Sequence, residues 1–203
     1  MPRPGTVSDH FRPRTLSDHS PAPLGSPRVP TVPQSLVHRN AIAVTAAARA
    51  LGLDIDVMEF PEGTRTAEDA AAAIGVTVGQ IVKSLVFAVG AEAAAAHGTH
   101  PGETVVAYVS GSNQLDELAL AAATGAERAW RVDANAVRAA TGFPVGGVPP
   151  FGHVTTMRVF VDEDLLSHEV VWAAAGTPRH VFALTSKQLL ETSGAIPARL
   201  ARR

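Results

Sequence analysis

The sequence predicts a single α/β domain of the α+β type, with a mixed, curved sheet or partial barrel and helices packed on its outside. Short runs rich in Val, Ile and Phe, typical of strands, interleave with Ala-rich segments of helical periodicity. They do so without the strict strand–helix–strand rhythm of a parallel sheet. The chain of 203 residues can bury a sizeable core, and because only 5% of it is aromatic, that core should consist mainly of Val, Leu and Ile.

Residues 1–34 differ in composition from the rest of the chain. They hold eight of the fifteen prolines and no long apolar run, and the short segment Thr6–His10 is echoed by Thr15–His19. Such a segment buries too little apolar surface to offset the entropy lost on ordering. We therefore predict a disordered Pro-rich extension over residues 1–34 and a folded domain over residues 35–203.

The first half of this domain is predicted to alternate between helices and strands. Thr66 with Asp69 forms a capping-box pattern, and Gly75 ends the helix that the pattern opens. Gly52 and Pro61 end the two segments before it. The predicted elements are a helix over 35–51, a strand over 55–60, a helix over 66–75, a strand over 81–87 and, after a loop over 90–102, a strand over 104–110.

The second half carries similar signals. Asp133 is a favourable N-cap and Gly142 a helix stop, while Ser186 is expected to cap a last helix that ends at Gly194. The predicted elements are helices over 115–123 and 134–140, three successive strands over 157–161, 169–173 and 180–184, and a helix over 186–194.

Several classes of function are disfavoured by composition. The absence of cysteine excludes disulfides, thiolate metal sites and a cysteine nucleophile. The formal net charge of -2 provides no global basic field, so we predict no DNA partner. No segment has the roughly 18 to 20 continuous apolar residues of a membrane span, and the N-terminus lacks the apolar part of a signal peptide. We therefore predict a cytoplasmic protein without a membrane partner.

Common catalytic and cofactor motifs are also missing. There is no G-x-S-x-G, Walker A or G-x-G-x-x-G sequence. His97 and His100 form an H-x-x-H pair, but it lies in a Gly-rich loop without a third ligand nearby. The adjacent carboxylates of residues 162–164 point in different directions at a strand end, which is typical of a solvated exit. We therefore predict no metal and no other cofactor.

Lys83 is one of only two lysines and lies inside the apolar run Ile81–Phe87. A buried, unpaired ammonium costs several kcal/mol, so the side chain either extends its charge to solvent or serves a purpose in a pocket. In the second case it is a point charge that holds a phosphate, a carbonyl or an amino acid. The other lysine, Lys187, lies in a polar stretch.

The segment 141–153 combines four glycines and three prolines in thirteen residues. Proline fixes φ while glycine permits close backbone approach, so such a loop can be rigid and still contact a ligand. It is either a long connection between a helix and a strand or a binding loop. Loops of this length without secondary structure are usually functional or disordered, and its prolines and aromatic residues argue against disorder.

In their order along the chain, these motifs resemble those of the YbaK family, relatives of the editing domain inserted in bacterial prolyl-tRNA synthetases. The resemblance covers about residues 36–195. The segments that carry it are Thr64–Ala71, Gln80–Phe87, Gly142–Phe143, Gly146–Gly152, Val161–Glu163, Ala175–Pro178 and Val181–Thr185.

This resemblance implies a free-standing aminoacyl-tRNA deacylase that hydrolyses the ester of a mischarged tRNA, with the tRNA acceptor end and a cognate synthetase as partners. The strand lysine of the family corresponds to Lys83, which would anchor the terminal phosphate or the carbonyl. The G-x-x-x-P loop corresponds to residues 146–150, where the backbone of Gly146 and Gly147 would line the amino-acid pocket and orient the ester.

Four further residues are predicted to bind substrate. Ser84 and Pro150 would line the site, and Asp162 would hold the α-ammonium group or pair with Lys83. Gly176 would let the backbone approach the terminal adenosine. Pro149 departs from the family, in which many members carry a small polar residue there, so the amino-acid specificity stays open.

Two other classes of function compete with this hypothesis. The same fold could bind an aminoacyl or nucleotide group without hydrolysing it, because the proposed reaction needs no nucleophilic side chain. A Schiff-base enzyme using Lys83 is the third class, but it requires an acid–base set beside the lysine that the sequence does not identify.

Overall fold

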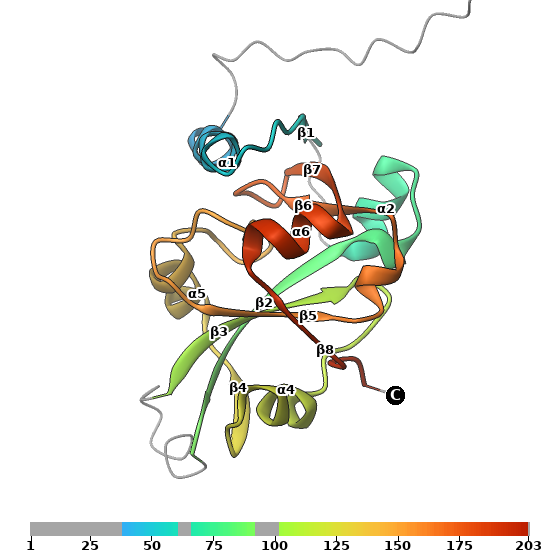
Figure 1. The fold of residues 1–203 in the computed structure, drawn as a ribbon. Coiled ribbons are helices and arrows are strands. Elements are labelled where there is room, and N and C mark those ends of the chain that lie inside the picture. Colours follow the sequence, from blue (N-terminus) through green and yellow to red (C-terminus); the bar gives the residue numbers. More distant parts are fainter. Residues whose placement is uncertain (1–37, 61–65, 92–101, 203) are drawn as a thin grey trace, which may run out of the picture. The chain divides into compact units, whose positions relative to one another are not determined.

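The computed structural model describes residues 38–60, 66–91 and 102–202, all within one unit, Gln34–Arg203 (Figure 1). The predicted disordered extension, residues 1–34, lies outside the described residues, and so do His97 and His100.

The predicted helices are present, and local capping explains their ends. Thr66 and Asp69 form the expected capping box, and Gly75 and Gly142 end their helices in the left-handed conformation. One cap was assigned wrongly: Thr185, rather than Ser186, caps the last helix by accepting from the N–H of Gln188. The described helices are α1 (Arg39–Ala50), α2 (Ala67–Ile74), α4 (Glu117–Thr124), α5 (Ala134–Thr141), α6 (Ser186–Ser193) and the 3-10 turns η2 (Val78–Gln80) and η3 (Leu165–Ser167).

The strands form two sheets rather than one, and neither is closed into a barrel among the described residues. The larger has the order β4-β2-β3-β5-β8 and is mixed, because β5 and β8 pair in parallel while β2 pairs antiparallel with β3 and β4. The smaller, β1-β7-β6, is antiparallel. The strands are β1 (Val57–Glu59), β2 (Val82–Gly90), β3 (Glu103–Ser110), β4 (Arg128–Arg131), β5 (Arg158–Asp162), β6 (Val170–Ala174), β7 (His180–Thr185) and β8 (Ile196–Ala198).

The α+β class and the mixed sheet are thus confirmed, with two differences. The three successive strands predicted over 157–184 divide between the sheets, since β5 joins the larger and β6 and β7 the smaller. The short strands β4 and β8 were not predicted from the sequence.

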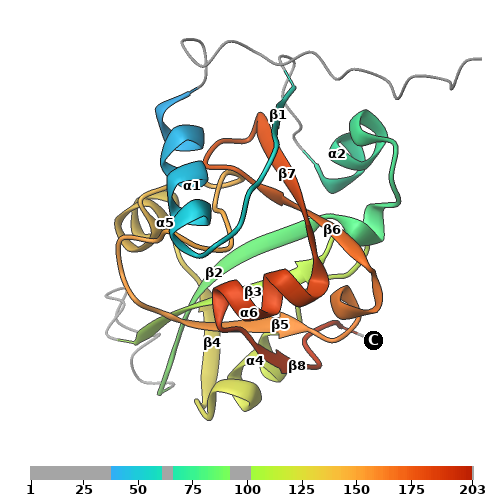
Figure 2. The ribbon, with the colours of Figure 1, turned by 45° about the horizontal axis from the view of Figure 1, so that its top comes forward.

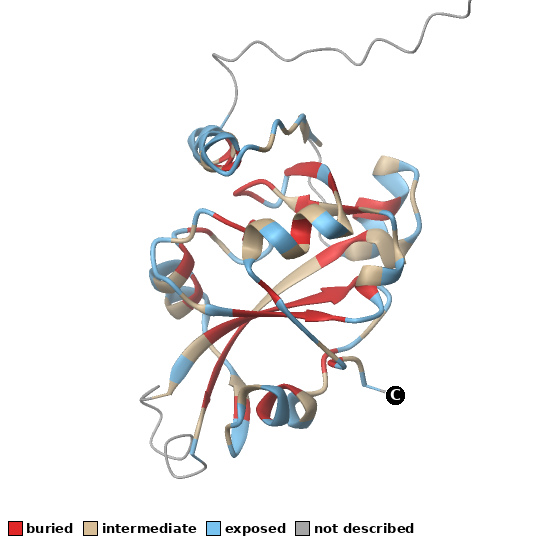
Figure 3. Ribbon diagram, in the orientation of Figure 1, coloured by how far each residue is buried: buried red, intermediate tan, exposed pale blue. Residues whose placement is uncertain are grey.

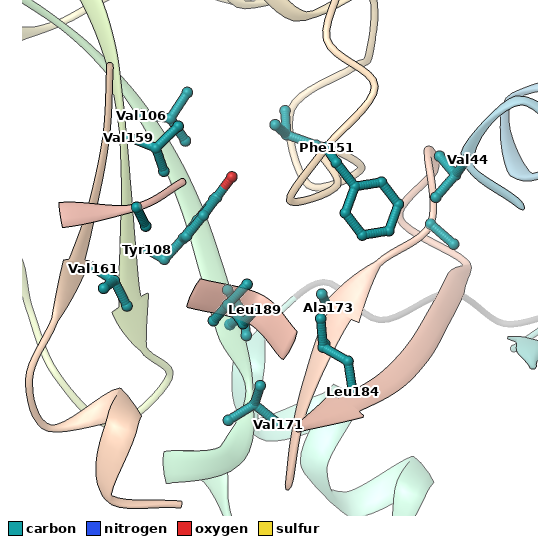
Figure 4. Close-up of a cluster of buried hydrophobic side chains, with 14 of the residues drawn as sticks. Val44, Val106, Tyr108, Phe151, Val159, Val161, Val171, Ala173, Leu184 and Leu189 are labelled. Carbon is teal, nitrogen blue, oxygen red and sulfur yellow. The ribbon is translucent and has the colours of Figure 1, made fainter. Parts of the chain in front are cut away.

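The main core lies between the two sheets, and its side chains are mostly aliphatic (Figure 4). A second cluster packs on the other side of the larger sheet, beneath α4. Figure 3 shows how the buried residues concentrate in the central strands of that sheet. The close-up labels side chains from both sheets: Val106, Tyr108, Val159 and Val161 from β3 and β5, and Val171, Ala173 and Leu184 from β6 and β7.

Strand β2 has one neighbour along its first half and two along its second half. It pairs with β3 from Val82 to Val89, whereas β4 pairs only with Phe87–Gly90. Just before β2, Ile81 forms an isolated parallel bridge with Trp172 of β6. Within the described part of the chain, residues 82–86 therefore have an open edge. Such an edge presents backbone N–H and C=O groups that no strand satisfies.

Among the helices that the structure describes, none combines the length and the apolar character needed to cross a bilayer.

Candidate active site

A cavity of about 430 Å³ lies along the open edge of β2. Its other walls come from α2, from β6 and β7 and from the loop that follows α5; Figure 2 shows α2 beside β6 and the beginning of β2. Most of its lining is apolar. The lining residues on β2 are Val82, Lys83, Ser84 and Leu85, those on and before α2 are Thr66, Ala67, Glu68, Ala70 and Ile74, and the loop contributes Val145, Gly146 and Val148.

Lys83 reaches this cavity with its ammonium group held in place. Its Nζ donates to the backbone oxygen of Gly111 at 3.2 Å and to that of Asn113. Burial lowers the pKa of Lys83, the negative charge of Glu68 partly raises it, and the positive charge of Arg131 lowers it. An ammonium has three N–H donors, and these two bonds leave one for a ligand. Lys83 is thus an oriented donor rather than a side chain extended into bulk water.

The turn that holds Lys83 is itself supported by Asp162. The side-chain amide of Asn113 donates to Asp162 Oδ2 at 3.0 Å and to Asp164 Oδ2 at 2.9 Å. Asp162 Oδ1 accepts from the backbone N–H groups of Leu200 and Ala201 at 3.0 and 3.2 Å. The carboxylate of Asp162 therefore bonds to Asn113 and to the backbone that follows β8. Asp162 is 2% exposed and is not among the cavity-lining residues.

Ser84 contributes an unsatisfied polar atom. Its Oγ is buried and has no hydrogen-bond partner among the described residues. A buried hydroxyl without a partner costs about 1–3 kcal/mol, which a hydrogen bond to a bound ligand would offset. Because Ser84 also lines the cavity, its hydroxyl is available to a substrate.

The loop after α5 brings Gly146 and Gly147 against the turn 176–178. Gly146 has a φ of 78° and lines the cavity. At Gly147 a Cβ atom would lie 2.7 Å from the Cα atom of Thr177 and 2.9 Å from the carbonyl carbon of Gly176, so only glycine permits this approach. The loop is therefore closely packed on the turn 176–178, as its glycines permit.

Pro150 and Gly176 lie outside the residues that line the cavity. Pro150 is buried, and its carbonyl oxygen accepts from the Tyr108 hydroxyl at 2.9 Å. Gly176 has a φ of 88°, and its carbonyl oxygen accepts from the Asn40 side chain of α1 at 2.9 Å. The structure thus brings Lys83, Ser84 and Gly146 to one cavity, whereas Gly147 packs on the turn 176–178. Pro150, Asp162 and Gly176 occupy supporting positions.

His180 stabilises the turn on which Gly147 packs. Its Nδ1 lies 2.6 Å from Thr177 Oγ1, and its Nε2 is 3.9 Å from Glu59 Oε1. Burial lowers the pKa of His180, while the charge of Glu59 raises it in part. The neutral ring is therefore favoured, and it bonds to Thr177 in the turn on which Gly147 packs.

No group of three or more His, Asp and Glu side chains in the described ranges is arranged to hold a metal ion.

Glu68 and Trp172 are two of the cavity residues that were not selected from the sequence. Glu68 follows the helix cap Thr66, where an acidic residue is expected for the helix alone. In the sequence, Trp172 is indistinguishable from the other apolar residues of its strand. The position of Glu68 inside the motif Thr64–Ala71 was the available signal, because that segment carried part of the family resemblance.

The fold and the cavity define an editing-domain architecture, and comparisons with known proteins identify the family. The family model for the aminoacyl-tRNA editing domain matches residues 61–192. The chain therefore belongs to the aminoacyl-tRNA editing domain family, and the resemblance inferred from the motifs is confirmed.

Individual relatives cover most of the domain. The chain is similar to the solved structure of a protein proposed to be a trans-editing enzyme for prolyl tRNA synthetase (TM-score 0.73, 41% identity, covering 82% of this chain and 99% of that one). It is 31% identical over 138 residues to YwhH of Bacillus subtilis, covering 68% of this chain and 81% of YwhH. It is 27% identical over 140 residues to EbsC of Enterococcus faecalis, named as a candidate Cys-tRNA(Pro)/Cys-tRNA(Cys) deacylase, covering 65% and 79% respectively.

Proposed function

We propose that this protein is a trans-editing deacylase that hydrolyses the ester bond of mischarged aminoacyl-tRNA without a metal ion. The observation that carries the proposal is the oriented ammonium of Lys83, with one donor unused, at the open edge of β2 in a cavity of about 430 Å³. Membership of the aminoacyl-tRNA editing domain family supports it. We also propose that the protein acts in the cytoplasm beside a cognate synthetase.

The need for such an enzyme follows from the limits of apolar recognition. A synthetase rejects a smaller or nearly isosteric amino acid by only about 10- to 200-fold through apolar contacts, so a second hydrolytic site is required. An aminoacyl ester is already reactive, and positioning with backbone donors can therefore hydrolyse it without a covalent intermediate.

In the proposed reaction, water attacks the ester carbonyl carbon and the bond from that carbon to the ribose oxygen breaks. The ribose oxygen takes up a proton, and the products are the free amino acid and the uncharged tRNA. Lys83 donates to the carbonyl oxygen or to the terminal phosphate. Backbone N–H groups at the open edge of β2 and at Gly146 and Gly147 stabilise the negative charge that develops. Ser84 Oγ binds the aminoacyl group, and a ribose hydroxyl of the tRNA assists the attacking water.

The three remaining predicted site residues hold the catalytic groups in position. Asp162 orients the Asn113 turn behind Lys83, Pro150 anchors the end of the glycine loop through Tyr108, and Gly176 supplies the surface on which Gly147 packs. These roles replace direct contact with substrate as our proposal for Asp162, Pro150 and Gly176.

A panel of tRNAs, each charged with one amino acid, tests the proposal. Because the relatives point to the proline system, the panel begins with Cys-tRNA(Pro) and Ala-tRNA(Pro) and includes Pro-tRNA(Pro) as the correctly charged control. We expect release of free amino acid from at least one mischarged tRNA, at a rate unchanged by EDTA. Binding of the panel without hydrolysis would instead identify a binding module, and loss of activity in EDTA with recovery in zinc would contradict metal independence.

A further inference from the structure

Among the described residues that line the cavity beside β2, one side chain is positive and one is negative. Of the residues that line it, Lys83 and Glu68 carry charge, and the others are apolar or neutral. Lys83 belongs to β2, whereas Glu68 lies in the first turn of α2, a separate wall of the cavity. The fold therefore places two opposite charges on two sides of one ligand-sized space.

These two charges interact across the cavity without forming an ion pair in the described structure. Each hydrogen bond of Lys83 goes to a backbone oxygen, of Gly111 or of Asn113. The Glu68 charge nevertheless raises the pKa of Lys83 against the larger effect of burial. Because both side chains line the same cavity and Glu68 is exposed, a ligand that carries complementary groups at its two ends can contact both.

An aminoacyl ester has such groups. Its carbonyl and the neighbouring phosphate accept from a cation, while the α-amino group of a free amino acid is a cation itself. A carboxylate binds an ammonium through charge-assisted hydrogen bonds, which become stronger when the ligand displaces water. An N-acylated ester, such as a formylated or peptidyl ester, lacks that charge.

We propose that Glu68 binds the α-ammonium group of the aminoacyl ester, an inference that rests on the proposed function. The site then accepts esters of free α-amino acids and rejects N-acylated ones. Glu68 is then a specificity-determining residue, and it protects peptidyl esters from hydrolysis by the same protein.

The position of Glu68 offers a competing explanation. An acidic residue in the first turn of a helix is favourable for the helix itself. In that role, loss of the charge would alter the stability of α2 and would affect every substrate to the same extent. A comparison of two substrates that differ only at the amino group separates the two roles.

The experiment uses one tRNA charged with the amino acid that the wild-type protein releases fastest, and the same aminoacyl-tRNA after N-acetylation. Wild type should prefer the free amino form by at least about tenfold in kcat/KM. Glu68→Gln should lose most of that preference. Its kcat/KM should fall for the aminoacyl-tRNA with a free amino group and stay unchanged for the N-acetylated one. Glu191→Gln, at an exposed helical glutamate that pairs with Lys187 away from the cavity, should keep the wild-type ratio. An unchanged ratio in Glu68→Gln, or equal losses on both substrates, would overturn the inference while the deacylase function stands.

If the protein hydrolyses no ester, the proposed function is contradicted, but the inference about Glu68 is not. A binding measurement then still tests the inference. The probes are 3′-amino-3′-deoxyadenosine carrying alanine in amide linkage and its N-acetylalanyl counterpart, titrated by calorimetry. We expect wild type to bind the alanyl probe at least about tenfold more tightly, and Glu68→Gln to bind both alike. Equal binding of the two probes by wild type, or no binding of the alanyl probe, would overturn the inference.

Discussion

The two halves of strand β2 differ both in composition and in surroundings, since only the first half carries polar side chains. Phe87–Gly90 lies between β3 and β4, and the side chains of residues 87–89 are at most 2% exposed. The first half pairs only with β3, and its Lys83 and Ser84 line the cavity. One strand therefore serves the core with its second half and the candidate site with its first. The end of β4 divides the two, because that strand covers the edge only from Phe87 onward.

Replacing Phe87 should produce the largest effect, and on stability. Phe87→Ala removes a ring that is 1% exposed from the core beneath α4 and should lower the free energy of unfolding by about 3–5 kcal/mol. Urea denaturation measures this loss. At a temperature where the variant is folded, its deacylation rate should stay near that of wild type. A loss of stability below about 1 kcal/mol would show that the second half of β2 is not a core element.

Gly147→Ala should affect both stability and activity. The new Cβ atom would meet the backbone of Gly176 and Thr177, so the cavity loop must shift, at a cost of about 1–3 kcal/mol. Gly90→Ala is the matched control in the doubly paired half of β2, where the nearest atoms would be 3.4 and 3.5 Å away. Melting curves and deacylation rates of both variants test this, and equal behaviour of the two would contradict the tight contact at Gly147.

Lys83→Ala should leave the fold intact and reduce deacylation by at least about tenfold, roughly 1.4 kcal/mol of transition-state stabilisation. Lys83→Arg should not restore the full rate, because the larger forked guanidinium cannot replace an ammonium held by two carbonyl groups. Lys187→Ala, at an exposed ion pair with Glu191, is the control and should be close to wild type. A fully active Lys83→Ala protein would exclude the proposed mechanism.

The smallest effect is expected at Ser84. Ser84→Ala removes a buried hydroxyl without a partner, so stability should be unchanged or higher by up to about 1 kcal/mol. The deacylation rate should fall by less than about tenfold, because one neutral hydrogen bond to the substrate is lost. Urea denaturation tests the expected stability, and deacylation kinetics on the same preparation test the expected rate. A clear loss of stability would mean that the hydroxyl has a structural role.

Local signals in the sequence predicted most element types and several exact caps. The Thr66–Asp69 box and the stop at Gly142 depend only on neighbouring residues, and both are confirmed. Strand β4 was missed because Arg128–Arg131 is short and half polar, and it becomes a strand only by pairing with β2. The division of β5 and β6 between two sheets likewise depends on contacts distant in sequence.

The same limit applies to the site. Lys83 could be selected because a lysine inside an apolar run requires an explanation. Glu68 could not, because an acidic residue at a helix start is ordinary and only the fold brings it to the cavity that Lys83 lines. For Asp162 the prediction of a solvated strand exit was wrong. The residue is 2% exposed, and its carboxylate accepts from Asn113 and from the backbone of Leu200 and Ala201, contacts that only the fold creates.

Asp162 also ties the surroundings of Lys83 to the last segment that the structure describes. Leu200 and Ala201, which donate to its carboxylate, follow every described helix and strand in the chain. Leu200 is itself fully buried in the cluster beneath α4. Local unfolding of residues 199–202 would therefore remove a core side chain and, in the same event, part of the support for the turn of Asn113, whose carbonyl holds the lysine.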